Sequence, residues 1–253
     1  MDGRFHIRGR FPAEARVRVQ GMGCSLRGVC GNRQNCLLVV MRMLRNATLY
    51  FLSLGVAAYA VLGYAAMPLG ALVHPNMRAD FVVHPLGVYS HVFAAATALA
   101  FGPFQFSTRL RATRTQLHRW MGRAYLGVGV LIGGLSGLYL SRFAFGGLAA
   151  KAGFAMLAVC WLYTGLRAFL AIRRGAIDEH RKWMLRNYSL AFAAVMLRIY
   201  IPVSALIGVD FAVAYPVIAW ACWTPNVFVV EWLAHNQSLQ PTATARFAGV
   251  GRG

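Results

Sequence analysis

Two histidines stand at similar points of two apolar stretches, each beside basic residues. His118 lies in the string HRWMGRAY and His180 in the string HRKWMLRNY. Two imidazoles from facing helices are the ligands that a bis-histidine haem b needs, and nearby arginines can neutralise its propionates. We therefore interpret His118 and His180 as an inner pair of iron ligands, against the alternative that both are interfacial residues of basic loops.

Arg198 and His91 form a second candidate group, each within an apolar stretch. Arg198 lies ten residues before Gly208, or about 15 Å of helix, too far for its guanidinium to reach water fully. Ionisable residues at such depth usually face a bundle interior or a partner. In the haem interpretation, His91 is the outer iron ligand and Arg198 binds a propionate. The alternative for both residues is packing alone.

His74 and His84 are weaker candidates for the same outer group. His84 precedes Pro85, which suits the first position of a helix. Seven residues, about 10.5 Å of helix, separate His84 from His91, so the two share a face but do not grip one metal ion. We expect His74 to face His84 across a loop, with Asp80 between them. No metal site is predicted beyond haem iron.

Two further features should shape the helices that carry these residues. Pro202 has no N–H for the carbonyl of Arg198, so we expect a kink there. Gly129, Gly133 and Gly137 recur on one helical face. They would admit a flat porphyrin or, as such ladders more often do, a neighbouring helix.

The elements that position these residues are long apolar segments. A membrane span needs about 20 mostly apolar residues, and six segments satisfy this: 47–73, 86–106, 120–140, 152–172, 184–208 and 211–232. Only 13% of the 253 residues are charged and 58% are hydrophobic, which argues against an ordinary soluble domain. The predicted fold class is an all-α integral membrane bundle of six transmembrane helices in the lipid bilayer.

The basic residues predict an orientation. The formal net charge is +19, and the arginines gather before the first span and in the connections after the second and fourth spans. The positive-inside rule therefore places both termini and these two connections in the cytoplasm. Because the basic residues lie between apolar spans, topology explains them better than nucleic acid does, and no nucleic-acid partner is predicted.

The two ends of the chain look like additions to the spans. Residues 1–40 are basic and are expected to be disordered or to precede the true start, near Met41 or Met43. The six-helix domain then covers residues 41–234, and residues 235–253 form a polar tail that is expected to be disordered. The cysteines do not show zinc-site spacing.

The two histidine strings also suggest an internal repeat. Their Trp, Met, Arg and Tyr residues align at a 63-residue offset, which favours duplicated hairpins of spans two–three and four–five over convergence at membrane interfaces. With HVFAAATALAFGPFQF at 91–106, these strings resemble a family of predicted bacterial membrane proteins known as domain of unknown function 2306. The resemblance covers spans two to six. It implies a location in the bacterial inner membrane and carries no activity.

Two functional hypotheses follow. The first is a haem b-binding redox membrane protein with an electron-transfer partner or a quinone. The second is a small-solute transporter in which Arg198 binds the substrate, His91 gates or protonates, and Asn226 joins the pathway, with Pro216 and Pro225 breaking the sixth helix. A non-catalytic assembly factor is a third alternative. The sequence has no P-loop, dinucleotide fingerprint or nucleophile–base pair that would predict an enzyme, and nothing in it indicates an oligomeric state.

Overall fold

The structure is a computed structural model that describes residues 33–238, where it consists of helices and connections without a strand. By its contacts, the chain divides into residues 1–45 and 46–253, and the described part of the first unit is the start of α1 (Arg33–Ala66). Six helical segments are long and apolar enough to cross a membrane, which confirms the predicted fold class. The predicted extension and tail lie largely outside the described residues.

Three of the six spans are single helices and three consist of consecutive helices. The single helices are α1, which provides the first span, α3 (Pro85–Gln105), the second, and α7 (Gly147–Arg173), the fourth. The third consists of α5 (Thr115–Ala124), the π-helical segment η2 (Tyr125–Ile132) and α6 (Gly133–Ser141). The fifth consists of α8 (Ile177–Ala191) and α9 (Ala193–Leu206), and the sixth of α10 (Phe211–Ala221) and α11 (Thr224–Ser238). Short helices α2 (Pro75–Val83) and α4 (Thr108–Thr113) lie in the connections.

The first helix ends earlier than the sequence predicts, at Ala66 instead of residue 73. Pro68 disfavours helical backbone at the residue before it, and Gly70 has a φ of 90°, a left-handed conformation that suits glycine. The chain then starts again as α2, where the His74 side chain accepts a hydrogen bond from the Asn76 N–H at 3.4 Å. The end of the predicted first span is therefore a loop followed by a short helix that packs against α3.

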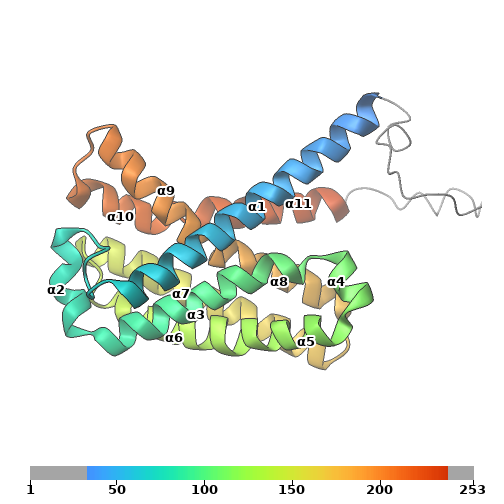
Figure 1. Cartoon of the computed structure of the whole chain (residues 1–253), viewed down its shortest axis with the longest axis horizontal. Coiled ribbons are helices and arrows are strands. Elements are labelled where there is room, and N and C mark those ends of the chain that lie inside the picture. Colours follow the sequence, from blue (N-terminus) through green and yellow to red (C-terminus); the bar gives the residue numbers. More distant parts are fainter. Residues whose placement is uncertain (1–32, 239–253) are drawn as a thin grey trace, which may run out of the picture. The chain divides into compact units, whose positions relative to one another are not determined.

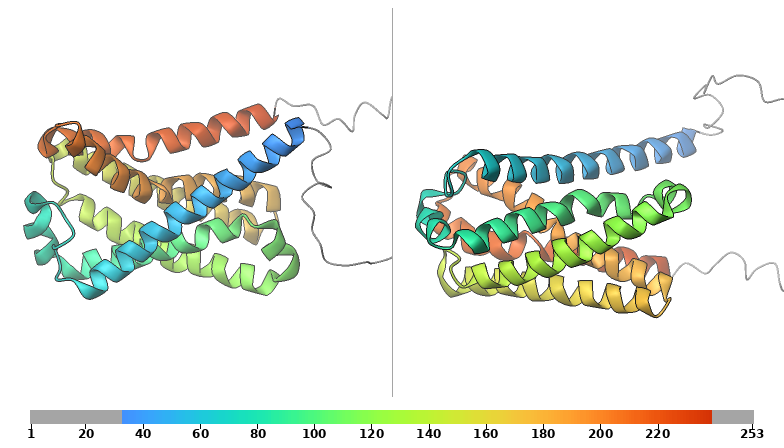
Figure 2. Two further views of the ribbon diagram at one scale, coloured as in Figure 1. Left: turned by 45° about the horizontal axis from the view of Figure 1, so that its top comes forward. Right: turned by 60° about the horizontal axis from the view of Figure 1, so that its bottom comes forward.

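Spans two to five form a ring in which each helix packs against the next. α3 contacts η2 and α6, α6 contacts α7, α7 contacts α8, and α8 contacts α3 again, as Figures 1 and 2 show. Small residues permit this approach, since a Cβ on Gly129 would lie 2.7 Å from the Cβ of Ala98. These four helices form the frame on which the candidate residues are placed.

A buried hydrogen-bond network connects three helices of this ring. The Tyr125 hydroxyl donates to Asn187 Oδ1 at 2.8 Å. The Asn187 amide donates to the Trp161 carbonyl at 2.7 Å and to the Thr164 hydroxyl at 2.8 Å. Tyr125 and Asn187 are both fully buried. Because unpaired polar groups are costly in an apolar interior, these bonds fix how η2, α7 and α8 meet.

The two histidine strings occupy similar positions in the ring. Met121 and Met184 are both buried, and so are Tyr125 and Tyr188. The Tyr188 hydroxyl shares a hydrogen bond of 2.6 Å with Ser53 of α1, while Tyr125 bonds within the ring. These shared environments fit a duplicated hairpin, and the duplication stays a prediction.

The fifth span is broken at Phe192, between α8 and α9, and α9 leaves the line of α8 beyond that point (Figure 1). The kink predicted at Pro202 is not where the helices separate, because α9 continues through Pro202 to Leu206. The missing N–H of this proline removes one backbone bond close to the end of the helix, where few bonds follow.

The sixth span is also broken, between α10 and α11, at Cys222 and Trp223. Pro225 lies just after this break, near the beginning of α11, as the sequence suggested, whereas Pro216 lies within α10. α10 packs against α7 and α9, and α11 packs against α8. Two of the six spans are therefore discontinuous.

Candidate functional site

A cavity of about 700 Å³ lies between the helices of the 46–238 region. Residues from α1, α2, α3, α6, α7, α8, α9 and α10 line it, and its size falls in the range of small-molecule sites. Most of the wall is aliphatic or aromatic, with Phe154, Trp161, Phe211 and Tyr215 among its residues. The wall therefore offers van der Waals contacts to an apolar molecule and few hydrogen-bonding groups.

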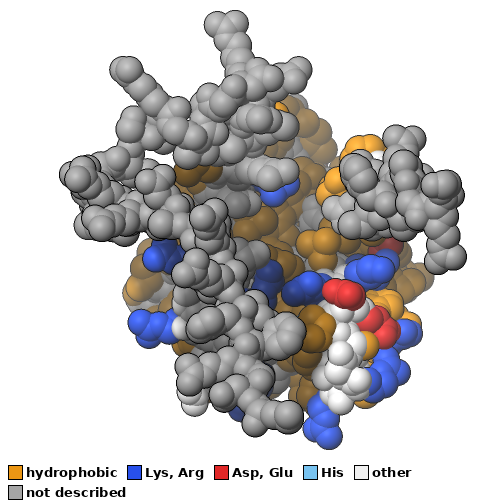
Figure 3. Space-filling model, turned by 90° about the vertical axis from the view of Figure 1, so that its right-hand side faces the viewer, with side chains coloured by type: hydrophobic (Ala, Val, Ile, Leu, Met, Phe, Trp, Pro, Cys, Tyr) orange, Lys and Arg blue, Asp and Glu red, His pale blue; other side chains and the backbone are white. Residues whose placement is uncertain are grey.

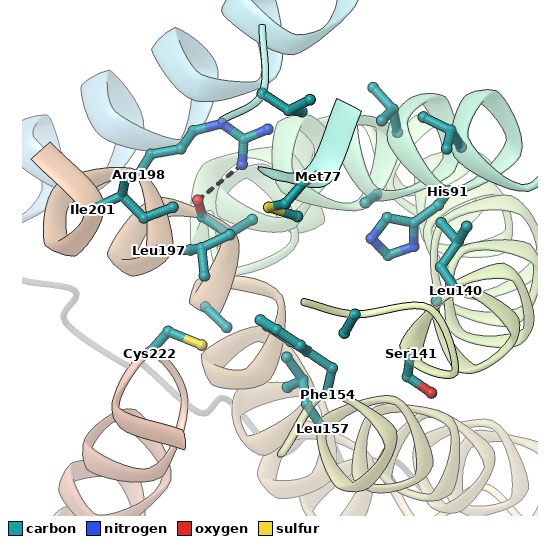
Figure 4. A pocket seen from close by; sticks show the side chains of 18 of the residues that line it. Met77, His91, Leu140, Ser141, Phe154, Leu157, Leu197, Arg198, Ile201 and Cys222 are labelled. Carbon is teal, nitrogen blue, oxygen red and sulfur yellow. Dashed lines mark hydrogen bonds between the residues drawn. The ribbon is translucent and has the colours of Figure 1, made fainter. Parts of the chain in front are cut away.

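Arg198 brings a cation into this apolar wall (Figure 4). Its Nη1 donates to the Ala194 carbonyl at 3.0 Å, one turn earlier in α9, and its guanidinium carbon lies 5.9 Å from the centre of the Tyr59 ring. No carboxylate among the described residues forms an ion pair with it. Since a guanidinium carries five N–H donors, most of them remain for a ligand in the cavity.

His91 faces the same cavity from α3 (Figure 4). Its Nδ1 lies 2.9 Å from the carbonyl oxygen of Gly133. A carbonyl can only accept, so Nδ1 carries the proton and the neutral ring has its free lone pair on Nε2. Gly137 makes room for the ring, because a Cβ there would lie 2.9 Å from His91 Cε1. Among the glycines on this helical face, Gly137 thus makes space for an imidazole, while Gly129 makes space for the neighbouring helix.

His74 lines the cavity, whereas His84 is not among the residues of its wall. The His74 ring stacks on Phe211, with 3.8 Å between centroids, and the His84 ring stacks on Phe143 at the same distance. Each imidazole thus has an aromatic partner of its own, and the expectation that the two face each other across Asp80 stays a prediction. Aromatic partners from two different parts of the chain hold them, and such partners cannot be read from local spacing.

His118 lies in α5 and His180 in α8. Neither histidine belongs to the wall of the cavity, and their pairing as iron ligands stays a prediction. His180 Nδ1 donates to the Ala168 carbonyl at 2.8 Å, while His118 Nδ1 is buried without a hydrogen-bond partner. Within residues 33–238, no group of three or more His, Cys, Asp or Glu side chains could hold a metal ion.

Both helix breaks adjoin the cavity. The residues on either side of Phe192 line it, and so does Cys222. Asn226 donates to the carbonyls of Ser189 and Cys222, at 3.2 and 3.1 Å, and so bridges the two broken spans. Asn226 is not among the residues that line the cavity, and its place in a polar pathway, as the transporter hypothesis has it, stays a prediction.

Most of the wall was not identified from the sequence. Trp161 comes from the one central helix without a histidine, and Tyr59 and Tyr64 come from α1. Aromatic residues are frequent in membrane spans, so their types alone carry no signal for a site. Only a knowledge of which helices meet could have selected them.

Comparison with known proteins assigns the chain to a family. Residues 88–234 match the model of a family described as a predicted membrane protein, DUF2306. This match covers more than half of the chain and includes the helix ring and both broken spans. No curated protein and no solved structure matches the chain. The chain therefore belongs to the DUF2306 family of predicted membrane proteins.

Proposed function

We propose that this membrane protein binds a largely apolar molecule with an anionic group in the cavity between Arg198 and His91. The observation that carries the proposal is an arginine that has no carboxylate partner among residues 33–238 and that faces a cavity of about 700 Å³ with mostly apolar walls. An ion in such surroundings is expensive unless it is paired. An anionic group on the ligand supplies the missing pair.

Haem b is the ligand that we propose first, because of the state of His91. Imidazoles that bind metal usually donate their other ring N–H to a carbonyl or carboxylate, and His91 Nδ1 donates in this way to Gly133. Its Nε2 would hold the iron, and Arg198 would bind a propionate. When bound, haem supplies one-electron transfer, which requires an electron-transfer partner or a quinone. The apolar wall would exclude water from the ring.

A small-solute carrier is the second candidate, and the helix breaks favour it. Carriers often place their substrate where two discontinuous helices meet, and the breaks of the fifth and sixth spans both adjoin the cavity. Arg198 would bind the anionic group of a lipophilic acid, and the apolar wall would contact its hydrocarbon part. In both candidates Arg198 has the same task, so one set of variants tests them together.

The first experiment is an absorption spectrum of the protein purified in detergent after expression with ample haem, oxidised and then reduced with dithionite. We expect a Soret shift and a sharp reduced α-band, and we expect His91→Ala to remove both. Arg198→Gln should weaken retention of the ligand by about tenfold or more, since hydrogen bonds to charged groups are strong. Arg198→Lys should restore part of it.

Arg142→Gln is the matched control, since Arg142 is exposed and lies outside the cavity wall. A haem spectrum that survives His91→Ala but is lost in His118→Ala and His180→Ala would move the haem to that pair. A featureless spectrum with a lipophilic acid recovered by mass spectrometry would select the carrier. Recovery of neither ligand from folded protein would overturn the proposal.

A further inference from the structure

The cavity between the helices is not closed on all sides. Gly55 and Tyr59 of α1 and Pro202 of α9 line it and are also exposed, with 49% of Tyr59 accessible. The cavity itself does not account for this exposure, because Trp161 and Tyr215 line the same space and are only 6% and 4% exposed. The cavity therefore meets the surroundings of the protein between α1 and α9.

The contact between α1 and α9 is closed at one point and open beyond it. Ala57 of α1 and Val195 of α9 are buried in one apolar cluster. Farther along, residues 58–66 of α1 and the rest of α9 run in different directions (Figure 1). There the guanidinium carbon of Arg198 lies 5.9 Å from the centre of the Tyr59 ring. Tyr59 and Arg198 therefore stand on the two sides of the opening, where close packing ends.

A second, smaller space shows that this region is loosely packed. It has a volume of about 60 Å³, lies between α1, α3 and α9, and shares His91 and Arg198 with the cavity. Alanines form much of its remaining wall, among them Ala57, Ala60 and Ala194. Because these side chains are short, the side chain of Arg198 has room to move when a ligand passes.

The opening lies at the depth of the hydrocarbon layer. Tyr59 precedes Ala66, the last residue of α1, by seven residues, or about 10 Å of helix. Arg198 precedes Leu206, the last residue of α9, by eight residues, or about 12 Å of helix. Because a span crosses a hydrocarbon layer of about 30 Å, an opening this far from the helix ends faces acyl chains.

The exposed side chains beside the opening suit lipid. Leu62 of α1 and Val203 of α9 are both exposed, whereas Lys and Arg side chains gather at the end of the molecule where α4 lies (Figure 3). Exposed apolar side chains of this kind are typical of a surface that contacts the membrane. The opening therefore admits molecules that are dissolved in the bilayer.

The wall of the cavity has exposed residues at one other place, where His74 and Asp80 of α2 lie. The His74 ring stacks there on Phe211 of α10, with 3.8 Å between centroids, and the same side chain accepts a hydrogen bond from the Asn76 N–H. These contacts connect α2 to α10 across that side of the cavity. The opening between α1 and α9 is therefore the route that the geometry favours.

We propose that the ligand enters this cavity from the hydrocarbon layer of the membrane, through the opening between Tyr59 and Arg198. The inference rests on the proposed function and narrows its ligand to an anionic molecule that dissolves in the bilayer, as haem and long-chain carboxylates do. Small water-soluble anions are excluded. The guanidinium of Arg198 stands at the opening, so it binds the acidic group, and the hydrocarbon part occupies the apolar cavity.

The test uses nitroxide-labelled stearate as the probe and the full-length protein in lipid nanodiscs, purified after expression without added haem. A nitroxide quenches tryptophan fluorescence at short range, and Trp161→Phe identifies the part of the signal that comes from the cavity wall. We expect saturable quenching of Trp161 by the probe. After mixing with an excess of empty vesicles, the recovery of fluorescence gives the rate at which the probe leaves the cavity.

Gly55→Phe and Gly127→Phe are matched variants, because both glycines are exposed in helices and neither has an atom within 4 Å of the position of a Cβ. Of the two, Gly55 lines the cavity. Gly55→Phe should slow release of the probe by about tenfold or more, since a bulky side chain obstructs the path, whereas Gly127→Phe should change it by less than about twofold. Tyr59→Ala should accelerate release by about threefold or more, because it removes one side of the opening.

Release rates that Gly55→Phe and Tyr59→Ala leave unchanged would overturn the inference, and weaker binding of the probe in Arg198→Gln would show that the proposed function still holds. Slower release in His74→Trp, but not in Gly55→Phe, would place the opening at α2 and overturn the inference as well. Absence of quenching in the folded protein would also overturn it, while the absorption spectrum decides the proposed function separately.

Discussion

Asn187 illustrates what a polar side chain must achieve at the centre of a membrane bundle. It is fully buried, accepts a bond from Tyr125 and donates to α7 at two points. Each of its amide atoms thus has a partner from another helix. Arg198 shows the opposite situation, because within the part of the chain that the structure describes it hydrogen-bonds only to its own helix, at Ala194. Asn187 therefore stabilises the fold, whereas the guanidinium of Arg198 keeps donors that a ligand could use.

We expect Asn187→Leu to destabilise the protein by roughly 2 kcal/mol, because it leaves the Tyr125 hydroxyl and the Trp161 carbonyl without this partner. Thermal unfolding in detergent measures the change. Ser136→Ala is the control, since the Ser136 hydroxyl bonds to its own helix at Ile132, and its cost should stay below about 0.5 kcal/mol. Equal destabilisation by the two variants would contradict the role given to Asn187.

At the residue scale, the sequence revealed the groups that are unusual for their surroundings. Arg198 and His91 are polar residues in apolar segments, and both line the cavity. Gln105 gave no such signal, because a glutamine at a helix end is ordinary until the structure shows its amide buried. The pairing of His74 with Phe211 depends on tertiary packing. Spacing along the sequence could therefore not predict this partner.

Glycines decide how closely the elements approach. Gly129 in η2 lies against the backbone of α3, where a Cβ would meet the Cα of Ala98 at 3.0 Å. Gly127, two residues earlier in η2, has nothing within 4 Å of the position of a Cβ. In this segment, packing against α3 therefore requires glycine at Gly129 but not at Gly127.

We expect Gly129→Ala to destabilise the helix ring by about 1–3 kcal/mol, because the added methyl group would force α3 and η2 apart. Gly127→Ala should be neutral or stabilise by up to about 1 kcal/mol, since alanine favours helix and meets no atom. Unfolding of the two variants under the same detergent conditions gives the comparison. A tolerated Gly129→Ala would mean that α3 and η2 are less closely packed than the structure describes.

At the element scale, hydropathy predicted the number of spans, since a membrane imposes a minimum apolar length. It did not predict where they are interrupted. Pro68 could have marked the end of the first helix, but the apolar run continues past it. The break at Phe192 has no glycine or proline at that position. At this break α9 turns away from the direction of α8 and packs against α10. The position of the break therefore depends on tertiary packing and not on a local sequence signal.

The whole chain distributes its charge unevenly. The connection after α3 carries Arg109, Arg111 and Arg114 and the one after α7 carries Arg174, and further arginines lie in the adjoining helix ends, whereas the opposite connections carry only Arg78 and Arg142. The basic connections lie at the same end of the helix ring as the starts of α5 and α8. The orientation of this end with respect to the cytoplasm follows from the positive-inside rule and stays a prediction.

That orientation is testable with single cysteines in a variant without the native ones. We expect Arg174→Cys to be shielded from a membrane-impermeant maleimide in intact bacterial cells and labelled after permeabilisation, because the positive-inside rule places it in the cytoplasm. Arg142→Cys, at the opposite end, should be labelled in intact cells. Both positions are exposed in the structure. The reversed labelling pattern would invert the topology.

Arg198 also has a consequence for the order in which the membrane protein is assembled. Inserting an arginine near the middle of a helix costs about 2.5–3.5 kcal/mol, yet the span that contains it is the most apolar of the six. Its aromatic neighbour Tyr59 belongs to the first span, which leaves the ribosome well before the fifth. The apolar residues of this span thus offset the cost of Arg198, and the first span, with Tyr59, has already been synthesised when Arg198 reaches the bilayer.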